Sequence, residues 1–381
     1  MRFPRFHTIS VAVLGVLTAA AIAVPVTGGA AVARAATTTA TSCTALVSGP
    51  PVTMKVTTPG KAATCTFSGK VGQRISTVVT NLVINSGSGG SGCATLTLLN
   101  PSGGVVDSSG LDCGFSSIGL TNAPDVLTAS GTYTVRLELD QTDTGTAQLW
   151  VSTPVTVGTV AINGPPVSMN VTRVGQGVQR TFTGKAGQRI STVITNLVIN
   201  SGSGGSGCAT LTLLNPSGGV VDSSGLDCGF SSIGLTNAPD VLTVSGTYTV
   251  RLELDQTDTG TAKLWVSTPV TVGTVTVNGP PVSMNVTRVG QGVQRTFTGT
   301  AGQQINTVVT NLVINSGSGG SGCATLTLLN PKGGQVDSSG QDCGSSSIGI
   351  GPDKLLVSGT YTVRLELDQT ATGSGTLQVS T

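Results

Sequence analysis

The stretch TNLVINSGSGGSGCATLTLLNP, which runs from Thr80 to Pro101, decides how this chain is organised. The same segment recurs without a change at Thr195–Pro216 and at Thr310–Pro331, a step of 115 residues each time. A module of this length has the size of an ordinary domain. We therefore interpret the chain as three tandem repeats of one module. The expected domains are residues 36–153, 154–268 and 269–381, after a leader at 1–35.

The leader has the layout of a secretory signal peptide. Arg2 and Arg5 form a basic start, residues 9–26 are almost entirely apolar, and Ala-Arg-Ala at 33–35 offers a small-x-small cleavage site. A membrane anchor is the alternative, because the apolar run is near the minimum length that spans a bilayer. The small residues after the run favour cleavage, so we expect a secreted, extracellular protein with no stable membrane span.

Cleavage of the leader removes much of the reactive chemistry in the sequence. His7, the only histidine, leaves with it, as do Arg2, Arg5 and Arg34, which reduces the 19 basic residues to 16 against 17 acidic ones, a net charge of −1. No basic surface for nucleic acid is left. A Ser-His-Asp or Cys-His arrangement needs a histidine that the mature chain lacks. We expect neither catalysis nor a nucleic-acid partner.

Eight cysteines in a secreted chain predict disulfide bonds. Three pairs recur with the repeat at a spacing of 20, and each later repeat holds only two cysteines, so closure within a repeat is the simplest scheme. Each closed loop is expected to stabilise its repeat by about 3 kcal/mol. Zinc is not expected, because C-x-x-C pairs and histidine are missing. The predicted bridges are Cys93–Cys113, Cys208–Cys228 and Cys323–Cys343, with Cys43 and Cys65 as an additional pair at the front.

The segment TYTVRLELD at Thr132–Asp140 alternates strictly, with Tyr133, Val135, Leu137 and Leu139 on one face. This period of two is typical of a half-buried strand in an antiparallel sheet. Similar short stretches, separated by turns rich in Gly, Pro, Asn, Asp and Ser, follow along every repeat, and the mature chain has no useful helical period. The sequence therefore predicts an all-β fold of three tandem antiparallel β-sandwich, jelly-roll-like domains.

The outer repeats differ from the middle one in two places. Cys43 and Cys65 align with Gly158 and Arg180, so we expect the extra bridge to tie down a first strand that has no repeat before it. The third repeat is two residues shorter between Ile348 and Pro352, which predicts a tolerant surface loop there.

Two tryptophans mark another difference between the repeats. Trp150 and Trp265 align with Gln378, and the local alternation points both indoles away from the core. An outward tryptophan only in repeats that have a downstream neighbour suggests packing at the junction, because the end of a stacked array has to be polar. A carbohydrate-stacking surface and chance divergence remain the alternatives.

A glycine-rich loop resembles a nucleotide-binding motif in spacing only. Gly87, Gly89 and Gly92 satisfy G-x-G-x-x-G, but a strand follows them instead of the helix N-terminus that a pyrophosphate needs. We interpret this segment as an inter-strand loop. Binding of a partner by the loop is the alternative, since loops at one end of a sandwich often carry function.

Several carboxylates lie on or beside neighbouring strands. Arg136 lies on the same face as Glu138 and neutralises it in the simplest interpretation. Calcium bound through oxygen ligands is the alternative cofactor, and a catalytic pair is the less favoured one. We expect no other cofactor or metal. The acidic residues in question are Glu138, Asp140, Asp143, Asp107 and Asp112.

One combination of motifs resembles a known family. Leu98–Gly104, LLNPSGG, is followed by Ser130–Val135, SGTYTV, and the pattern returns in all three repeats. It is similar to the bacterial pre-peptidase C-terminal type of β-sandwich and to tandem modules of secreted and surface proteins of actinobacteria. The resemblance implies adhesion, surface or substrate binding, or spacing, and it carries over no site residue. Such modules usually accompany a catalytic domain, whereas this sequence consists of modules only.

These observations together predict a secreted, non-catalytic structural or adhesive repeat protein of the bacterial cell surface or extracellular matrix. Its expected partners are cell-wall or extracellular glycans or surface proteins. The alternative function is carbohydrate binding, with Trp150 and Trp265 as stacking platforms at or near the junctions.

Overall fold

The structure is a computed structural model, and its description covers most of the chain from residue 42 onward. The predicted signal peptide and its cleavage site lie outside the described residues. Within them, no helix is long and apolar enough to cross a membrane. The described ranges are residues 42–87, 89–90, 92–121, 124–202, 207–235, 239–316 and 322–381.

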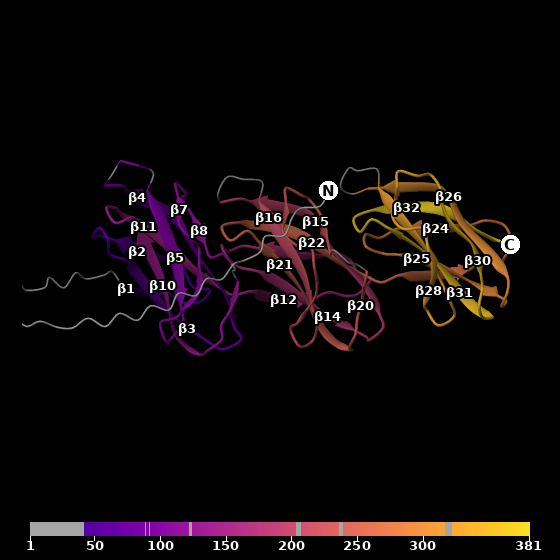
Figure 1. The fold of residues 1–381 in the computed structure, drawn as a ribbon, viewed down its shortest axis with the longest axis horizontal. Helices are drawn as coiled ribbons and strands as arrows, with labels where there is room; N and C mark the ends of the chain where they lie inside the picture. The colour runs from indigo at the N-terminus through magenta and orange to yellow at the C-terminus, as the bar shows by residue number, and fades with distance from the viewer. Residues whose placement is uncertain are drawn as a thin grey trace, which may run out of the picture. The chain divides into compact units, whose positions relative to one another are not determined.

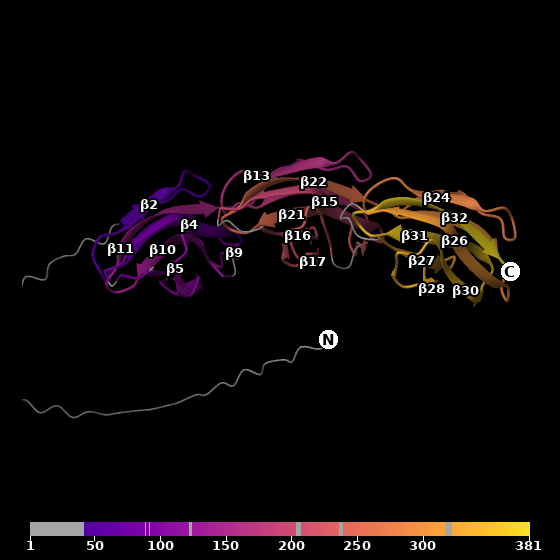
Figure 2. The same cartoon turned by 90° about the horizontal axis from the view of Figure 1, so that it is seen from above.

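The predicted all-β fold is confirmed, because every regular element in the described ranges is a β-strand. Each repeat consists of two separate sheets, and in each repeat a hydrophobic core lies between them. Figure 1 labels the strands, and Figure 2 shows the two layers of the second repeat, with β13 (Val167–Val171) and β22 (Thr259–Ser267) in one and β16 (Cys208–Leu214) and β17 (Val220–Ser223) in the other.

The first repeat sets the pattern for the other two. Its larger sheet has the order β1-β3-β10-β5-β6, with β7 beside β5, and its smaller sheet has the order β2-β11-β4-β8, with β9 beside β4. The larger sheet consists of β1 (Ser42–Thr44), β3 (Ala63–Gly69), β5 (Cys93–Leu99), β6 (Val105–Ser108), β7 (Asp112–Cys113) and β10 (Gly131–Leu139). The smaller consists of β2 (Val52–Val56), β4 (Arg74–Asn85), β8 (Ile118–Gly119), β9 (Asp125–Val126) and β11 (Thr144–Ser152).

The second repeat has the same topology as the first. Besides the strands already named, its larger sheet contains β12 (Val155–Thr159), β14 (Val178–Gly184), β18 (Asp227–Cys228) and β21 (Gly246–Leu254). Its smaller sheet also contains β15 (Arg189–Asn200), β19 (Ile233–Gly234) and β20 (Asp240–Val241).

The third repeat departs from the pattern where its sequence is shorter. The first two repeats place two short strands beside the long one, whereas the third has a single strand, β30 (Ile348–Lys354), paired with β26 (Gln304–Asn315). The prediction of a surface loop between Ile348 and Pro352 was wrong. The two-residue deletion shortens the segment that separates the two short strands in the other repeats, so that here they form one continuous strand along β26. The remaining strands are β23 (Val270–Thr274), β24 (Val282–Val286), β25 (Val293–Gly299), β27 (Cys323–Leu329), β28 (Gln335–Ser338), β29 (Asp342–Cys343), β31 (Gly359–Leu367) and β32 (Thr372–Ser380).

The sheets are antiparallel with one exception in each repeat. The first strand pairs in parallel with the third, as β1 does with β3, β12 with β14 and β23 with β25. The strand between them lies in the opposite sheet and carries the chain back, so that the third strand runs in the direction of the first.

A stacked aromatic pair fills the centre of each core. In the first repeat Phe67 and Tyr133 lie with ring centroids 5.6 Å apart, and both side chains are buried. The Tyr133 hydroxyl donates a hydrogen bond to the Ala129 carbonyl at 2.9 Å, which satisfies the one polar group of the ring. Phe182 with Tyr248 and Phe297 with Tyr361 repeat this arrangement.

The way in which the first strand is attached to its sheet differs between the repeats. In the first repeat the Cys43–Cys65 disulfide joins β1 to β3. In the second repeat Arg180 takes the place of Cys65, and its guanidinium donates to the Thr159 carbonyl at 3.3 Å and to the Ser168 carbonyl at 3.0 Å. The covalent bridge therefore occurs only in the repeat whose first strand follows no other repeat.

Candidate functional site

Each tryptophan singled out by the sequence lies where one repeat meets the next. Trp150 is on β11, and its indole N–H donates to Thr80 Oγ1 at 2.9 Å. The guanidinium carbon of Arg173, a residue of the second repeat, lies 4.7 Å from the ring centroid. A cation in this position is worth about 0.5–2 kcal/mol, more as the pair is desolvated. The contact recurs between Trp265 and Arg288, also at 4.7 Å.

The turn that carries Arg173 docks against the end of β11. Arg173 Nε donates to Ser152 Oγ at 3.1 Å, and that hydroxyl donates to the Val174 carbonyl at 2.8 Å. Ser152 is fully buried, so both of its hydrogen bonds are made away from water. At the second junction, Arg288, Ser267 and Val289 form the same chain of hydrogen bonds.

A glycine at the tip of this turn allows the close approach. Gly175 has a φ of +67°, and a Cβ there would lie 3.1 Å from Val78 Cγ2. Val78 is completely buried, although it lies on the outer side of its sheet. The turn of the second repeat therefore completes the packing of the first.

A glutamine makes a further contact between the repeats. The Gln256 amide donates to the Leu120 carbonyl at the first junction, and the Gln369 amide donates to the Leu235 carbonyl at 2.5 Å at the second. Gly119 lies against this side chain, and a Cβ at that position would overlap Gln256 Oε1. Small residues on one repeat thus fit long polar residues on the next.

The Arg–Glu pair on the TVRLELD strand is exposed in one repeat and covered in the others. In the first repeat Arg136 and Glu138 lie 3.2 Å apart with side-chain exposures of 37% and 44%. In the second repeat Arg251 and Glu253 lie 3.1 Å apart with exposures of 4% and 17%. The strand itself has the same sequence, but its surroundings differ. Gln179 on β14 faces Arg251 where Thr64 on β3 faces Arg136, and Arg74 of the preceding repeat lines the same groove as Arg251 and Glu253.

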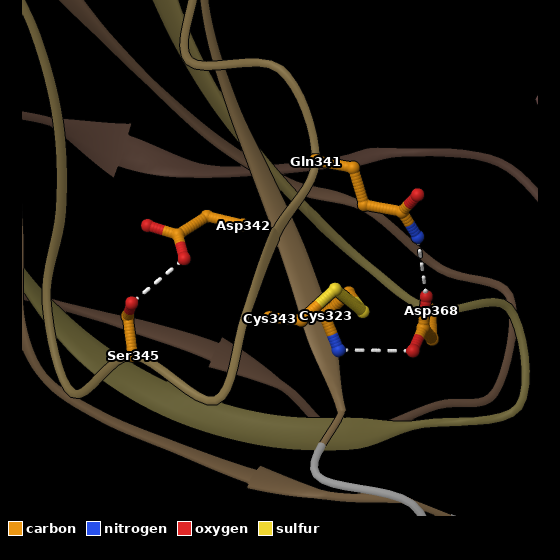
Figure 3. The surroundings of a disulfide bond; sticks show 6 residues. All are labelled: Cys323, Gln341, Asp342, Cys343, Ser345 and Asp368. Atoms are coloured by element: carbon orange, nitrogen blue, oxygen red, sulfur yellow. Dashed lines mark hydrogen bonds between the residues drawn. A yellow bond between two sulfur atoms is a disulfide. The ribbon is translucent and has the colours of Figure 1, made fainter.

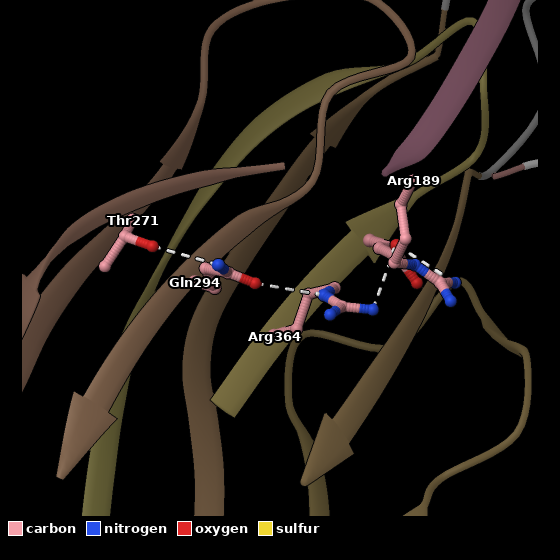
Figure 4. Close-up of polar contacts among 5 residues, drawn as sticks. Arg189, Thr271, Gln294 and Arg364 are labelled. Carbon is pink, nitrogen blue, oxygen red and sulfur yellow. Dashed lines mark hydrogen bonds and ion pairs between the residues drawn. The ribbon is translucent and has the colours of Figure 1, made fainter. Parts of the chain in front are cut away.

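At the second junction the same ion pair extends across the boundary. Arg189 of the second repeat lies 3.9 Å from Glu366 of the third, which also lies 3.9 Å from Arg364. Figure 4 shows Arg364 donating to Gln294, at 3.2 Å, and Gln294 donating to Thr271, at 2.9 Å. A half-covered ion pair of this kind costs desolvation energy that offsets much of its Coulomb attraction.

Polar grooves of about 460 and 470 Å³ lie along the first and second junctions. The first is lined by Arg74, Glu253 and Gln256, among others, and the second by Glu366 and Gln369. The described residues include no histidine, and their cysteines are all in disulfides. These grooves therefore offer hydrogen bonding and charge.

The carboxylates noted in the sequence do not gather at one place. Asp143 Oδ1 accepts the Gly87 N–H at 3.1 Å, which attaches the glycine-rich loop to the β10–β11 turn. Among the described residues there is no group of three or more His, Cys, Asp or Glu side chains that could hold a metal ion. Two carboxyls that the sequence did not indicate are Asp125, half-buried beside Asp107 and Arg74, and its equivalent Asp240, buried beside Asp222 and Arg189.

Lowering the pH is expected to stabilise these repeats. Burial, and then the charge of Asp107 or Asp222, raises the pKa of Asp125 and of Asp240 to about 6, whereas an unfolded aspartate titrates near about 3.9. The folded state therefore binds the proton more tightly, and its stability is greatest below about pH 4 and falls as the pH rises through about 6.

Thermal unfolding of the Asp125→Asn/Asp240→Asn variant tests this expectation. The variant is expected to be more stable than the wild type at pH 7.5, by about 1 kcal/mol per site once solvent screening is allowed for, and to lose most of this difference as the pH falls from about 6 to about 4. Asp140→Asn, at an exposed position, serves as the control. A pH profile unchanged by the double variant would show that other groups cause the dependence.

All eight cysteines are paired in the structure. Cys43 bonds to Cys65, and the three repeated bridges are Cys93–Cys113, Cys208–Cys228 and Cys323–Cys343, each joining two adjacent strands of the larger sheet. Figure 3 shows the bridge of the third repeat, where Asp368 accepts the Cys323 N–H at 2.9 Å and the Gln341 amide at 3.2 Å. Four disulfides are typical of proteins in oxidising compartments.

The arginines that lie over the two tryptophans were not predicted from the sequence. Arg173 and Arg288 lie in turns between strands, and the residues around them in the sequence do not indicate that they contact a tryptophan of the preceding repeat. The signal was available in the comparison of repeats, because the first repeat has Thr58 at this position. Only the repeats with an upstream neighbour carry the arginine.

The fold and the junctions define the class of protein as a tandem β-sandwich repeat protein. No protein-family model matches the chain, and no curated protein matches it. Among solved structures it is similar to PliG, a periplasmic inhibitor of g-type lysozyme from Aeromonas hydrophila, with 14% identity, a TM-score of 0.21 and coverage of 30% of this chain and 96% of that chain.

Two further solved structures are similar over longer stretches. The serine-rich repeat protein Srr2 from Streptococcus agalactiae matches with 11% identity, a TM-score of 0.16 and coverage of 54% of this chain and 79% of that chain. The BSP domain of a biofilm-associated protein matches with 12% identity, a TM-score of 0.13 and coverage of 87% and 65%. Because the TM-scores are far below 0.5, these likenesses do not bear on function.

Proposed function

We propose that the mature chain is a secreted, non-catalytic structural or adhesive repeat protein of the bacterial cell surface or extracellular matrix. The observation that carries this proposal is the junction, built twice from the same residues. Trp150 and Arg173 at the first junction recur as Trp265 and Arg288 at the second, with the same hydrogen bonds around them. Side chains that would otherwise be free to bind a ligand are used here to hold one repeat against the next.

The geometry supports this role over carbohydrate binding by the tryptophans. A sugar stacks on an open aromatic face, whereas one face of each indole is already covered by a guanidinium. The indole N–H groups, which would otherwise be free to bind a hydroxyl group, donate to Thr80 and Thr195. The polar grooves beside the junctions support contact with glycans or surface proteins at other positions.

A distance measurement across the first junction tests the structural part of the proposal. Spin labels at Lys55 and Asn170, equivalent and exposed positions of the first two repeats, are expected to give one narrow distance distribution. In a Trp150→Gln/Arg173→Thr variant, which has the residues of the terminal repeats, the distribution is expected to broaden. An equally broad distribution in both proteins would contradict a structural role for the junction.

Binding assays on the intact mature chain test the adhesive part. We expect retention on bacterial envelope fractions, no change in tryptophan emission with soluble glycans, and no turnover in a hydrolase screen. Quenching of tryptophan emission by a glycan would favour the carbohydrate-binding alternative, and turnover of any substrate would overturn the non-catalytic assignment.

A further inference from the structure

We infer that this chain terminates its own array: its upstream face lacks the arginine, and its downstream face the tryptophan, that pair at each junction, so a second copy adds at neither end. The inference rests on the proposed structural role of the junctions. It concerns the first repeat's upstream face and the third repeat's downstream face, which are the faces that meet no other repeat.

The downstream face is altered at several of the positions that contact a following repeat in the first two repeats. Trp150 and Trp265 are replaced by Gln378, which is exposed and cannot accept a guanidinium over an aromatic ring. Val78 and Val193 are fully buried under the next repeat, whereas Val308 at the same position is 37% exposed.

Two more substitutions change the charge and shape of this face. Arg189 reaches Glu366 across the second junction, and its counterpart in the third repeat is Gln304, which is exposed. Ser191, whose Cβ would lie 3.3 Å from a Cβ at Gly290, is replaced by the larger Asn306. A further turn of the Gly175 or Gly290 type would therefore meet a longer side chain and no ionic partner.

The upstream face is altered in a complementary way. The turn of the first repeat keeps its glycine, Gly60, with a φ of +69°. Two contact residues of this turn are absent, because Thr58 stands in place of Arg173 and Arg288, and Lys61 in place of Gln176 and Gln291, whereas Glu138 and Gln141 keep the residue types of Glu253 and Gln256. The turn has kept its conformation and lost its binding side chains.

The distribution of differences along the sequence agrees with this division. Residues 195–268 of the second repeat differ from 80–153 of the first only at Val244 and Lys263. Residues 154–184 differ from 269–299 of the third only at Ala161 and Ile162. The middle repeat thus matches the first where both have a downstream neighbour and the third where both have an upstream one. Capping repeats with a polar outer face are what a soluble array needs.

Restoring both faces in the full-length mature chain tests the inference. The expected product is an open, head-to-tail chain, because the contact is heterologous and does not close on itself. Short linkers hold the internal junctions at an effective concentration of about 1 mM, so association is followed up to about 1 mM by sedimentation equilibrium. The downstream graft is Gln304→Arg, Asn306→Ser and Gln378→Trp, and the upstream graft is Thr58→Arg, Pro59→Val and Lys61→Gln.

Six samples separate recognition between the two faces from nonspecific adhesion by an exposed tryptophan. The wild type and each single graft are expected to remain monomeric, an equimolar mixture of the single grafts to form 1:1 dimers, and the double graft to form longer chains. Asn170→Trp, which exposes a tryptophan away from both outward faces, is expected to remain monomeric.

Two results would overturn the inference. One is head-to-tail assembly of the wild type; the other is a double graft that stays monomeric while its circular dichroism and melting temperature match those of the wild type. If a graft lowers the melting temperature, a variant of the first internal junction tests the inference instead. Arg173→Thr/Trp150→Gln should loosen the first junction, and an unchanged distance between labels at Lys55 and Asn170 would count against the inference. Envelope retention and glycan binding are separate readouts, so failure here is distinguishable from failure of the proposed function.

Discussion

Replacing Tyr248 by alanine is expected to remove about 3–5 kcal/mol from the free energy of unfolding of the second repeat. The ring lies on β21, is fully buried and stacks on Phe182 with centroids 5.6 Å apart. It also packs against Gly184, where a Cβ would come within 3.0 Å of the ring. Alanine would leave a cavity between the two sheets that these neighbours cannot fill, because the strands around it are held by both ladders.

Tyr248→Phe is the matched control for this prediction. It keeps the ring and removes the hydroxyl, which donates to the Val244 carbonyl at 2.7 Å and accepts the Val244 N–H at 3.4 Å, so the expected loss is about 1 kcal/mol. Hydrogen exchange followed by mass spectrometry resolves the three repeats, and peptides from the first and third serve as internal references. Equal losses in the two variants would mean that the hydroxyl, and not the stacked ring, holds this core together.

The fold could be predicted because its determinants are local and repeated. Alternation in TYTVRLELD places Tyr133, Val135 and Leu137 on one face, and the structure buries all three. The parallel first strand could not be predicted in the same way, since pairing of β1 with β3 depends on β2 joining the opposite sheet. The merged strand β30 likewise depends on two pairings that the sequence places in separate segments.

The junction could be predicted only in part. The tryptophans were found because an outward aromatic residue is unusual and the last repeat lacks it. The burial of the Arg–Glu ion pair could not be predicted from the strand that carries it. Arg136 and Arg251 lie in identical strand sequences, yet their side chains are 37% and 4% exposed. The carboxyl pairs were missed for the same reason. Asp107 was grouped with Glu138, whereas the structure brings it to Asp125, which follows on another strand of the opposite sheet.

Replacing Gly175 by valine is expected to separate the second repeat from the first while both stay folded. A β-branched residue at a φ of +67° costs about 1–3 kcal/mol in backbone strain. Its side chain would also start 3.1 Å from Val78 Cγ2 and 3.3 Å from Ser76 Cβ, an overpacking that costs about another 1–3 kcal/mol. The turn relieves this overlap by moving away from β11, and Arg173 then leaves the face of Trp150.

Gly60→Val is the matched control, because it introduces the same backbone strain at a turn that contacts no other repeat. Gly60 has a φ of +69°, and a Cβ there would meet only the Gln141 carbonyl, at 3.7 Å. In a Trp265→Phe background Trp150 is the sole tryptophan, so its emission and its quenching by acrylamide report on the first junction alone. The emission is expected to shift to longer wavelength and the quenching to rise in Gly175→Val, and neither is expected to change in Gly60→Val. Because the two variants have the same backbone cost, identical emission from both would show that contact with the first repeat does not depend on this turn.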